Sequence, residues 1–508
     1  MGSSGFFSYR TGALLVVAGL TALVLLLPTA NATLDAWYYA ACVRWQQDVY
    51  LPHHLLYNAL GIAWVRLLPG EVDVRLGLTA LNALLYGAIL LALRPLLRAA
   101  GAPPETVAPW LLVVGSTFGL LRFATENEAY LAPLLCSVLA SGAWAKWARS
   151  EHSGHSGWLV LAGALAAGAC LLHQLHVWWW LALGLSTWWG RPRRWRATLL
   201  YAAPALLVPL AYVLAAGHAG FPRTVAGLTR FVLHDYVVNE ITPTLGGKTL
   251  LLTGINLLRT LGQAHGSTLL LLQRWPVLAV VPVAVGALLW QARRAWIARR
   301  DFPTTSQRLI WRSHALALGL HGAFAAANDG NAEFMVMLPV LGAILAVGGG
   351  HWRPQGLKLA GAALLLWNLT FGLLPTHFLR MNASAALAAR VRATPSAYWL
   401  LTDQHLTENR LIYDTGRFQW PRLRAAPTAL VRRDGGDARV FRQWLTAELL
   451  AARVVYTDAL GPPRPGRDSR AGSRWGRAGS GAVGGGSRRA QDVPPSRIQP
   501  WENELCVR

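Results

Sequence analysis

Residues 11–41 read TGALLVVAGLTALVLLLPTANATLDAWYYAA. The first part is an apolar run that can cross a bilayer as a helix, for which about 17 to 25 residues suffice. A carboxylate, Asp35, follows this run within the stretch Thr33–Ala41. We therefore expect a membrane helix with an acidic group just outside the bilayer, at the mouth of any cavity that the helices enclose.

Similar apolar runs recur along the first 375 residues. Apolar residues make up 54% of the chain and charged residues 14%. This composition predicts an all-α polytopic membrane protein with about eleven transmembrane helices. The predicted spans cover residues 11–28, 75–94, 106–122, 129–147, 157–175, 176–190, 198–217, 275–291, 310–326, 332–350 and 357–375.

Basic and acidic residues fall on opposite sides of these spans. Lys and Arg are enriched in cytoplasmic loops, so the basic loops predict a cytoplasmic amino terminus in a multi-pass cell membrane protein. The basic loops include Arg94, Arg98, Lys146 and the run Arg191–Arg196. The alternate loops then face outward, and they hold most of the acids of residues 1–375, namely Asp35, Asp48, Glu71, Asp73, Glu126, Glu128, Asp235, Glu240, Asp329 and Glu333.

The net charge of +23 follows from this topology and from a basic tail. No groove-reading motif accompanies the charge, so we do not expect a nucleic-acid partner. Ala30-Asn31-Ala32 also resembles a signal-peptidase site. Whether the first span is retained or cleaved stays open, and the length of the apolar run favours a retained helix.

Three regions differ in composition. Residues 1–375 are the predicted transmembrane domain. Residues 376–460 are less apolar and predict a small mixed α/β domain on the outer side, with helices over 382–393 and 438–452 and a strand over 398–402. Residues 461–508 are rich in Gly, Arg, Ser and Pro. Such a composition buries too little apolar surface to order itself, so we expect a disordered basic tail.

Two outer loops are long. In the first, residues 35–44 and 53–67 predict helices lying on the membrane surface. In the second, residues 247–262 predict another apolar helix. Shorter outer turns carry Arg122–Tyr130, His173–His176 and Asn328–Phe334. Charge at this depth is costly and tends to face a watery cavity or a partner. Because these turns share one side of the membrane, they predict one polar site.

The first outer loop resembles that of the GT-C membrane glycosyltransferases, which take a sugar from a polyprenyl-phosphate donor outside the cytoplasm. Leu34-Asp35-Ala36-Trp37-Tyr38-Tyr39 matches the position of their acidic motif. Pro52-His53-His54-Leu55-Leu56-Tyr57 resembles the element that bacterial members carry shortly after it. Many members pair the first acid with an adjacent one, whereas Ala36 follows here. A divalent cation is therefore left open, with no cofactor assigned and the metal unknown.

The resemblance implies transfer of a hexosyl or pentosyl group to a glycan, lipid or protein acceptor. A carboxylate must take the proton of the attacking hydroxyl, and we expect Asp35 to do so, with Asp48 and Glu126 as further catalytic carboxylates. Arg or His donors would stabilise the leaving phosphate. The predicted substrate-binding residues are His53, His54, Tyr57, Arg122, Glu128, His173, His176, Asp329 and Glu333.

A transporter or flippase of a lipid-linked or polar substrate is the main alternative, because it too would combine many spans with buried polar residues. No inverted repeat or acid in the middle of a span supports it. A non-catalytic membrane protein is the third reading. The donor sugar, the acceptor and the oligomeric state do not follow from the sequence.

Overall fold

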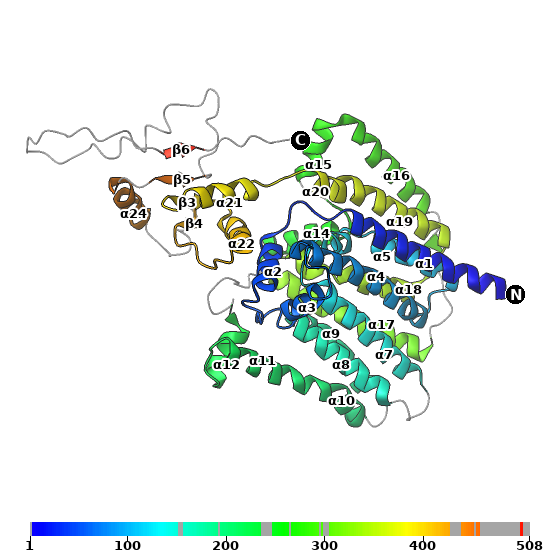
Figure 1. Ribbon diagram of the computed structural model, residues 1–508. Helices are drawn as coiled ribbons and strands as arrows, with labels where there is room; N and C mark the ends of the chain where they lie inside the picture. The colour runs from blue at the N-terminus through cyan, green and yellow to red at the C-terminus, as the bar shows by residue number, and fades with distance from the viewer. Residues whose placement is uncertain are drawn as a thin grey trace, which may run out of the picture. The chain divides into compact units, whose positions relative to one another are not determined.

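The computed structural model describes residues 3–150, 156–190, 194–234, 246–263, 266–293, 296–297, 304–426, 438–451, 454–457 and 498–500 (Figure 1). The chain divides into two units. One comprises Met1–Ala32 and Cys42–Leu379, and the other comprises Thr33–Ala41 and Arg380–Arg508. Asp35 therefore groups with the residues that follow Leu379. Most of the predicted tail, along with Asp235 and Glu240 of the second long loop, lies outside the described residues.

The first unit is built almost entirely of helices. Up to the second long outer loop they are α1 (Ser3–Leu26), the end of α2 (Leu34–Trp45), α3 (Tyr57–Val65), α4 (Val74–Ala100), α5 (Pro104–Gly115), α6 (Phe118–Ala124), α7 (Leu131–Arg149), α8 (Ser156–Leu172), η2 (Gln174–His176), α9 (Val177–Gly190), α10 (Arg194–Ala202), η3 (Ala203–Leu206) and α11 (Leu207–His218). The remaining elements are α12 (Val225–Val232), α14 (Gly247–Leu261), α15 (Gly266–Arg274), η4 (Pro276–Ala279), α16 (Val280–Arg293), α17 (Thr305–Ala327), η5 (Ala332–Met335), α18 (Leu338–Gly349), α19 (Pro354–Asn368), η6 (Leu369–Leu373) and α20 (Leu374–Phe378), with a short antiparallel pair, β1 (Trp296–Ile297) and β2 (His351–Trp352).

Seven helical segments among the described residues are long and apolar enough to cross a membrane. They are Tyr9–Leu26, Val74–Ala100, Leu131–Arg149, Trp195–His218, Pro276–Arg293, Ala332–Gly349 and Pro354–Phe378. If the bent pair of helices α5 and α6 counts as one span, the number of candidate spans among the described residues rises to eight. The protein is therefore a multi-pass membrane protein, while the predicted number of eleven spans and the orientation stay predictions. The predicted spans over 157–175, 176–190 and 310–326 coincide with α8, α9 and α17, which fall outside the seven.

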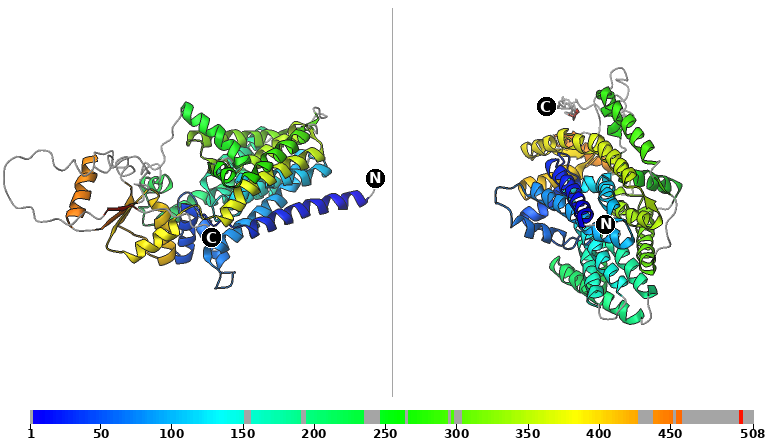
Figure 2. Two further views of the ribbon diagram at one scale, coloured as in Figure 1. Left: turned by 90° about the horizontal axis from the view of Figure 1, so that it is seen from above. Right: turned by 90° about the vertical axis from the view of Figure 1, so that its right-hand side faces the viewer.

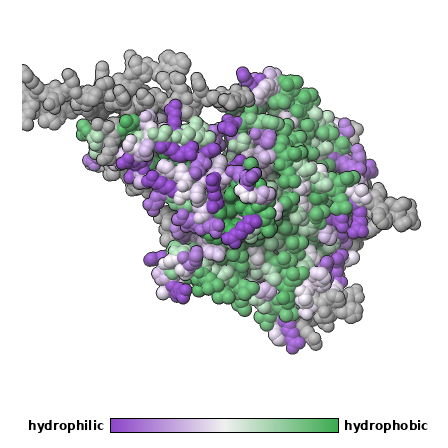
Figure 3. Space-filling view, viewed as in Figure 1, coloured by the Kyte–Doolittle hydropathy of each residue, from purple (hydrophilic) through white to green (hydrophobic). Residues whose placement is uncertain are grey.

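Helix α4 lies at the centre of the packing in this unit. It packs against α1, α5 and α7, and its Ile89, Leu90 and Leu93 are fully buried. Figure 2 shows the helices of this unit running alongside one another. Many apolar side chains on the outer helices are exposed, such as Leu214 on α11 and Val283 on α16, and apolar side chains cover much of the visible helical surface in Figure 3. Water would disfavour such a surface, whereas lipid tails accept it.

One predicted span is broken. Residues 106–122 were expected to form one helix, but α5 and α6 meet at an angle of 69°. The break frees the carbonyl of Ser116, which accepts a hydrogen bond of 2.8 Å from the Asn368 side-chain amide. Asn368 is fully buried. Irregular backbone at membrane depth persists only where protein groups satisfy it, so Asn368 stabilises the bend.

The second unit contains a parallel sheet with strand order β4-β3-β5-β6. Its elements are the start of α2, α21 (Ser384–Ala393), β3 (Tyr398–Leu401), α22 (Gln404–Thr415), β4 (Leu423–Ala425), α24 (Ala438–Leu450), β5 (Val455–Thr457) and β6 (Ile498–Pro500). Trp399 and Leu401 of β3 pack with Leu387 and Leu411 in its core. The predicted helix 382–393, strand 398–402 and helix 438–452 are confirmed as α21, β3 and α24.

Candidate functional site

The site in the first unit begins where α8 ends. His173 leaves the helix with an extended backbone and caps η2, and its Nδ1 accepts a hydrogen bond of 3.2 Å from the Leu175 backbone N–H. An accepting Nδ1 places the ring proton on Nε2. His173 is only 5% exposed. The local turn therefore directs this imidazole inward and sets its tautomer.

The loop before α3 is fastened to the same turn. The Gln174 backbone N–H donates to the His53 carbonyl at 3.0 Å, and the Gln174 side-chain amide donates to the Pro52 carbonyl at 2.9 Å. The Tyr212 hydroxyl also donates to the Pro52 carbonyl, at 2.8 Å. These bonds hold the predicted His53–His54 pair against the end of α8.

The imidazoles form a contiguous row. The rings of His54 and His173 meet edge to face with centroids 4.3 Å apart. His53 lies 6.3 Å from His54, and His176 lies 6.3 Å from His173. Burial lowers the pKa of the His173 imidazole well below its ordinary value, and neighbouring His54 adds to this shift. His173 is therefore neutral at physiological pH.

The row continues into the bundle through a residue that the sequence did not single out. His321 of α17 lies 5.9 Å from His176, measured between ring centroids, and both residues are fully buried. Within the described part of the chain, neither nitrogen of His321 has a hydrogen-bond partner. An ionisable side chain in the middle of a predicted span is the sequence signal for this residue.

The second half of the site is an acidic turn between α6 and α7. Glu126 and Glu128 are 3% and 1% exposed. The side-chain amide of Asn82 in α4 donates to the carbonyls of Phe123, Glu126 and Glu128, at 3.3, 2.7 and 2.8 Å. Asn82 was not predicted as a site residue, yet this single amide sets the course of the turn.

Arg122 links this turn to η5. Its Nη2 lies 3.3 Å from Glu333 Oε1, and its Nε lies 3.8 Å from Glu126 Oε2. The Tyr130 hydroxyl donates to Glu333 Oε2 at 3.3 Å. The Tyr130 ring also lies 4.9 Å from the His173 ring. Tyr130, which was not assigned a role from the sequence, thus connects the carboxylate cluster with the histidine row.

Tyr57 belongs electrostatically to the same site. Burial raises the pKa of the Tyr57 phenol well above its ordinary value, and the negative charge of Glu128 raises it further. The structure therefore brings together most of the predicted residues, namely His53, His54, Tyr57, Arg122, Glu126, Glu128, His173, His176 and Glu333.

Asp48, Asp329 and Asp35 are the other predicted site residues. Asp48 is exposed on the loop before α3 and has a positive φ of 49°. Asp329 shares a turn with Glu333 but accepts a hydrogen bond of 3.4 Å from Thr249. Asp35 is in the first turn of α2, in the second unit. Its place beside the histidine row and the acidic turn stays a prediction.

Within the second unit, the segment that carries Asp35 is well anchored. The Asn409 side chain of α22 donates to the Leu34 carbonyl at 2.9 Å. The Trp37 ring contacts Tyr413 at 5.2 Å, and the Arg410 guanidinium lies over Trp37 at 4.5 Å. This packing fixes the helical turn on which the carboxylate is presented.

A further arginine lies near Arg122. Helix α14 packs against α6, and its Arg259 donates from Nη1 to Asn256 Oδ1 at 2.9 Å. Burial lowers the pKa of Arg259, and the positive charge of Arg122 lowers it further. Arg259 Nε has no hydrogen-bond partner among the described residues. Two nearby guanidinium groups form an anion-binding arrangement.

A metal centre is not apparent in the described residues, where no group of three or more His, Cys, Asp or Glu side chains could hold a metal ion. The histidines are instead arranged as a row of contacting rings. The arrangement can supply carboxylates for proton transfer and guanidinium groups for an anion.

No protein-family model matches the chain, and no curated protein matches it. Solved structures do match. The apo oligosaccharyltransferase of Archaeoglobus fulgidus is 12% identical, with a TM-score of 0.43 over 81% of this chain and 64% of that chain. The same organism's AglB, in complex with an inhibitory peptide and a dolichol-phosphate, is 12% identical, with a TM-score of 0.42 over 84% of this chain and 65% of that chain.

ArnT from Cupriavidus metallidurans bound to undecaprenyl phosphate is 14% identical, with a TM-score of 0.33 over 85% of this chain and 91% of that chain. This chain spans less than two thirds of the length of the oligosaccharyltransferase. The matched proteins are GT-C type enzymes, the class that the first outer loop resembles. All three TM-scores are below 0.5.

Proposed function

We propose that this chain is a membrane glycosyltransferase that moves a sugar from a polyprenyl-phosphate donor to an extracytoplasmic acceptor. The observation that carries the proposal is the pair Arg122 and Arg259 beside the carboxylates of Glu126 and Glu333. Glu126 and Glu333 hold Arg122, while Arg259 keeps a buried Nε–H without a described partner. Such a group is costly to leave unpaired, and a phosphate oxygen would satisfy it.

The proposed step needs few groups. An acceptor hydroxyl attacks the anomeric carbon, the bond from that carbon to the phosphate oxygen breaks, and the polyprenyl phosphate leaves with both electrons. Asp35 takes the hydroxyl proton as general base. The guanidinium groups of Arg122 and Arg259 stabilise the negative charge that develops on the phosphate. Asp48 and Glu126 are the other carboxylates that could act as the base.

His173 adds a neutral imidazole to this site. Because His173 stays uncharged, it adds no positive charge that would compete with the arginines for the phosphate. His53, His54 and Tyr57 line the approach as predicted substrate contacts. In this proposal the reaction takes place on the extracytoplasmic side, with the amino terminus in the cytoplasm. The transferred sugar is a hexosyl or pentosyl group, and the acceptor is a glycan, lipid or protein.

Binding of undecaprenyl phosphate to the full chain in lipid nanodiscs tests the donor site, with undecaprenol as the phosphate-free control. Arg259→Gln should weaken binding by about tenfold or more, since a hydrogen bond to a charged group contributes roughly 1.5–3 kcal/mol. Arg230→Gln removes an exposed arginine of α12 and should change nothing. Equal affinity for undecaprenol, or an unchanged Arg259→Gln variant, would overturn the donor assignment.

A transporter of a polar or lipid-linked substrate is the second candidate. It is favoured by the fully buried His314 and His321 in α17, because buried ionisable residues in membrane helices often line substrate or proton paths. Counterflow in proteoliposomes separates the two. A transporter moves labelled polyprenyl-phosphate sugar across the bilayer without forming product, whereas a glycosyltransferase releases polyprenyl phosphate when an acceptor is present.

A further inference from the structure

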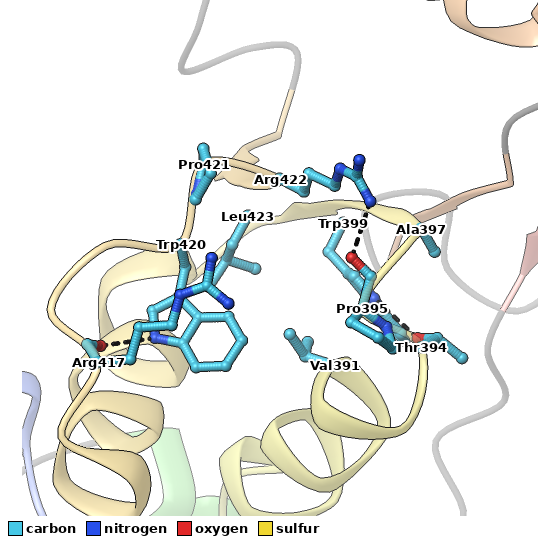
Figure 4. Close-up of a pocket in the computed structure, with 10 residues that line it drawn as sticks. All are labelled: Val391, Thr394, Pro395, Ala397, Trp399, Arg417, Trp420, Pro421, Arg422 and Leu423. Atoms are coloured by element: carbon cyan, nitrogen blue, oxygen red, sulfur yellow. Dashed lines mark hydrogen bonds between the residues drawn. The ribbon is translucent and has the colours of Figure 1, made fainter.

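The second unit contains a cavity that the proposed transfer chemistry does not use. It has a volume of about 300 Å³ and lies before the amino ends of β3 and β4 (Figure 4). One wall comes from the end of α21 and the residues leading into β3, and the other from the loop between α22 and β4. The cavity is therefore framed by the core of this unit.

The cavity has an apolar floor and an aromatic wall. Val391 and Leu423, which line it, are 4% and 3% exposed. The half-buried Trp420 faces the cavity in Figure 4, and its indole N–H donates to the Arg417 carbonyl at 3.0 Å. The Trp399 ring stacks on Tyr456 at 4.6 Å. Both indoles are thus held in place before any ligand binds.

Two arginines give the cavity a positive rim. The Arg417 guanidinium lies 4.9 Å from the Trp420 ring centroid, and its Nε donates to the Gln419 carbonyl at 2.9 Å. That leaves both terminal nitrogens of Arg417 without a hydrogen bond to any described residue. Arg422 donates from Nη1 to the Pro395 carbonyl at 2.9 Å across the cavity.

The rim charge is not compensated locally. No acid is among the residues that line the cavity, and neither Arg417 nor Arg422 forms an ion pair within the described ranges. Arg410 in the preceding helix shows the contrast, since its Nε lies 3.9 Å from Asp414 Oδ2. A guanidinium with a free pair of terminal nitrogens matches the two oxygens of a carboxylate.

We propose that this cavity binds an acidic saccharide, a pyranose ring that carries a carboxylate. The apolar face of the ring packs on Trp420, and the carboxylate receives two hydrogen bonds from Arg417. A volume at the lower end of ligand cavities, roughly 300–1,000 Å³, suits one sugar residue. Arg422 supplies a second positive charge at the opening. The residues that line this cavity are different from those of the proposed donor site, and the proposal does not depend on donor binding.

Saturation-transfer difference NMR on the full chain in nanodiscs tests the proposal. The probes are glucuronate, glucose, acetate and inorganic phosphate. We expect glucuronate to bind at least tenfold more tightly than each of the other three, because only it offers both the ring and the carboxylate. If glucose bound as tightly as glucuronate, the carboxylate would have no role in binding, and the proposal would be wrong. Equal binding of acetate or phosphate would reduce the cavity to an anion site, and no glucuronate signal would end the proposal.

Three variants locate the binding. Arg417→Gln changes an exposed side chain and should weaken glucuronate binding tenfold or more while leaving glucose unchanged. Trp420→Phe keeps a ring and should retain most of the affinity, whereas Trp420→Ala should lose it. Arg392→Gln removes one exposed positive charge from the same unit outside the cavity, and it is the matched control. A loss in Arg392→Gln equal to that in Arg417→Gln would show a diffuse charge effect and contradict the assignment.

Discussion

Arg122 and Glu333 meet with 3.3 Å between Nη2 and Oε1, which joins the end of α6 to η5. Their side chains are 30% and 25% exposed, so water screens the pair. Ion pairs of this kind stabilise a protein by roughly 0–1 kcal/mol. The contact therefore serves mainly to set the charge and direction of Arg122 rather than to hold the fold together.

Glu333→Gln should therefore raise the affinity for undecaprenyl phosphate while hardly changing thermal stability. Removing the Glu333 carboxylate frees part of the Arg122 charge for the phosphate. The ion pair contributes up to about 1 kcal/mol, which corresponds to a roughly fivefold change in affinity. Arg122→Gln should lower the affinity instead. Binding in nanodiscs measures both. A fall in affinity for Glu333→Gln would show that Glu333 contacts the donor in another way.

Replacing Asn82 by alanine should lower the stability of the protein strongly. Asn82→Ala removes a buried amide that donates to the carbonyls of Phe123, Glu126 and Glu128, and losing a buried hydrogen-bond donor costs about 1–3 kcal/mol. We expect a clear fall in the melting temperature in detergent and weaker donor binding, because the turn that carries Glu126 and Glu128 loses its anchor. Leu84→Ala, at a side chain of the same helix that is 44% exposed, is the control and should have little effect.

Gly330 tests how the turn before η5 docks on α14. Its φ is +63°, and a Cβ there would lie 2.5 Å from the Thr253 nitrogen. Gly330→Ala should destabilise the protein by about 1–3 kcal/mol, since overpacking forces backbone shifts. Gly342→Ala in α18, where a Cβ meets nothing within 4 Å, should be neutral or slightly stabilising. Similar melting temperatures for the two variants would mean that the turn is free to move.

The positions of helices followed well from the sequence because long apolar runs are a strong signal. Their internal breaks did not. The bend after Gly115 depends on Asn368, which lies far away in the chain and bonds the Ser116 carbonyl. No local pattern announces such a partner. The short strands β4 and β5 were also missed, because three-residue strands carry too little periodicity to be recognised. Helix α22 was missed as well.

The candidate site was predicted in part for the same reason. Acids and histidines in turns on one side of the membrane stand out by type and place, so Arg122, Glu126 and His173 could be found. Asn82 and His321 lie within apolar helices, and only packing shows that the first binds the acidic turn and the second contacts His176. A lone polar residue in a predicted span was the available signal for both.

His173 gives a pH prediction. Its folded-state pKa is lowered by burial, so the unfolded state binds a proton first as pH falls. The contribution of His173 to the free energy of unfolding is then fully present above the unfolded-state pKa of about 6.5. It declines as the pH falls below that value towards the folded-state pKa. The melting temperature should fall between about pH 7.5 and 5.5. The slope should be shallower in His173→Phe, and an unchanged slope would assign the effect to other groups.

Asp35→Asn keeps the shape of the side chain and removes the base. If Asp35 takes the acceptor proton, turnover of a polyprenyl-phosphate sugar should fall by about a hundredfold or more, the usual scale for a positioned base. Affinity for undecaprenyl phosphate should change little, because Arg122 and Arg259 hold the phosphate. Asp48→Asn tests the exposed alternative carboxylate, and Glu126→Gln tests the buried one. Full transfer activity in Asp35→Asn would end its assignment as the base, and loss only in Asp48→Asn or Glu126→Gln would move the role to that residue.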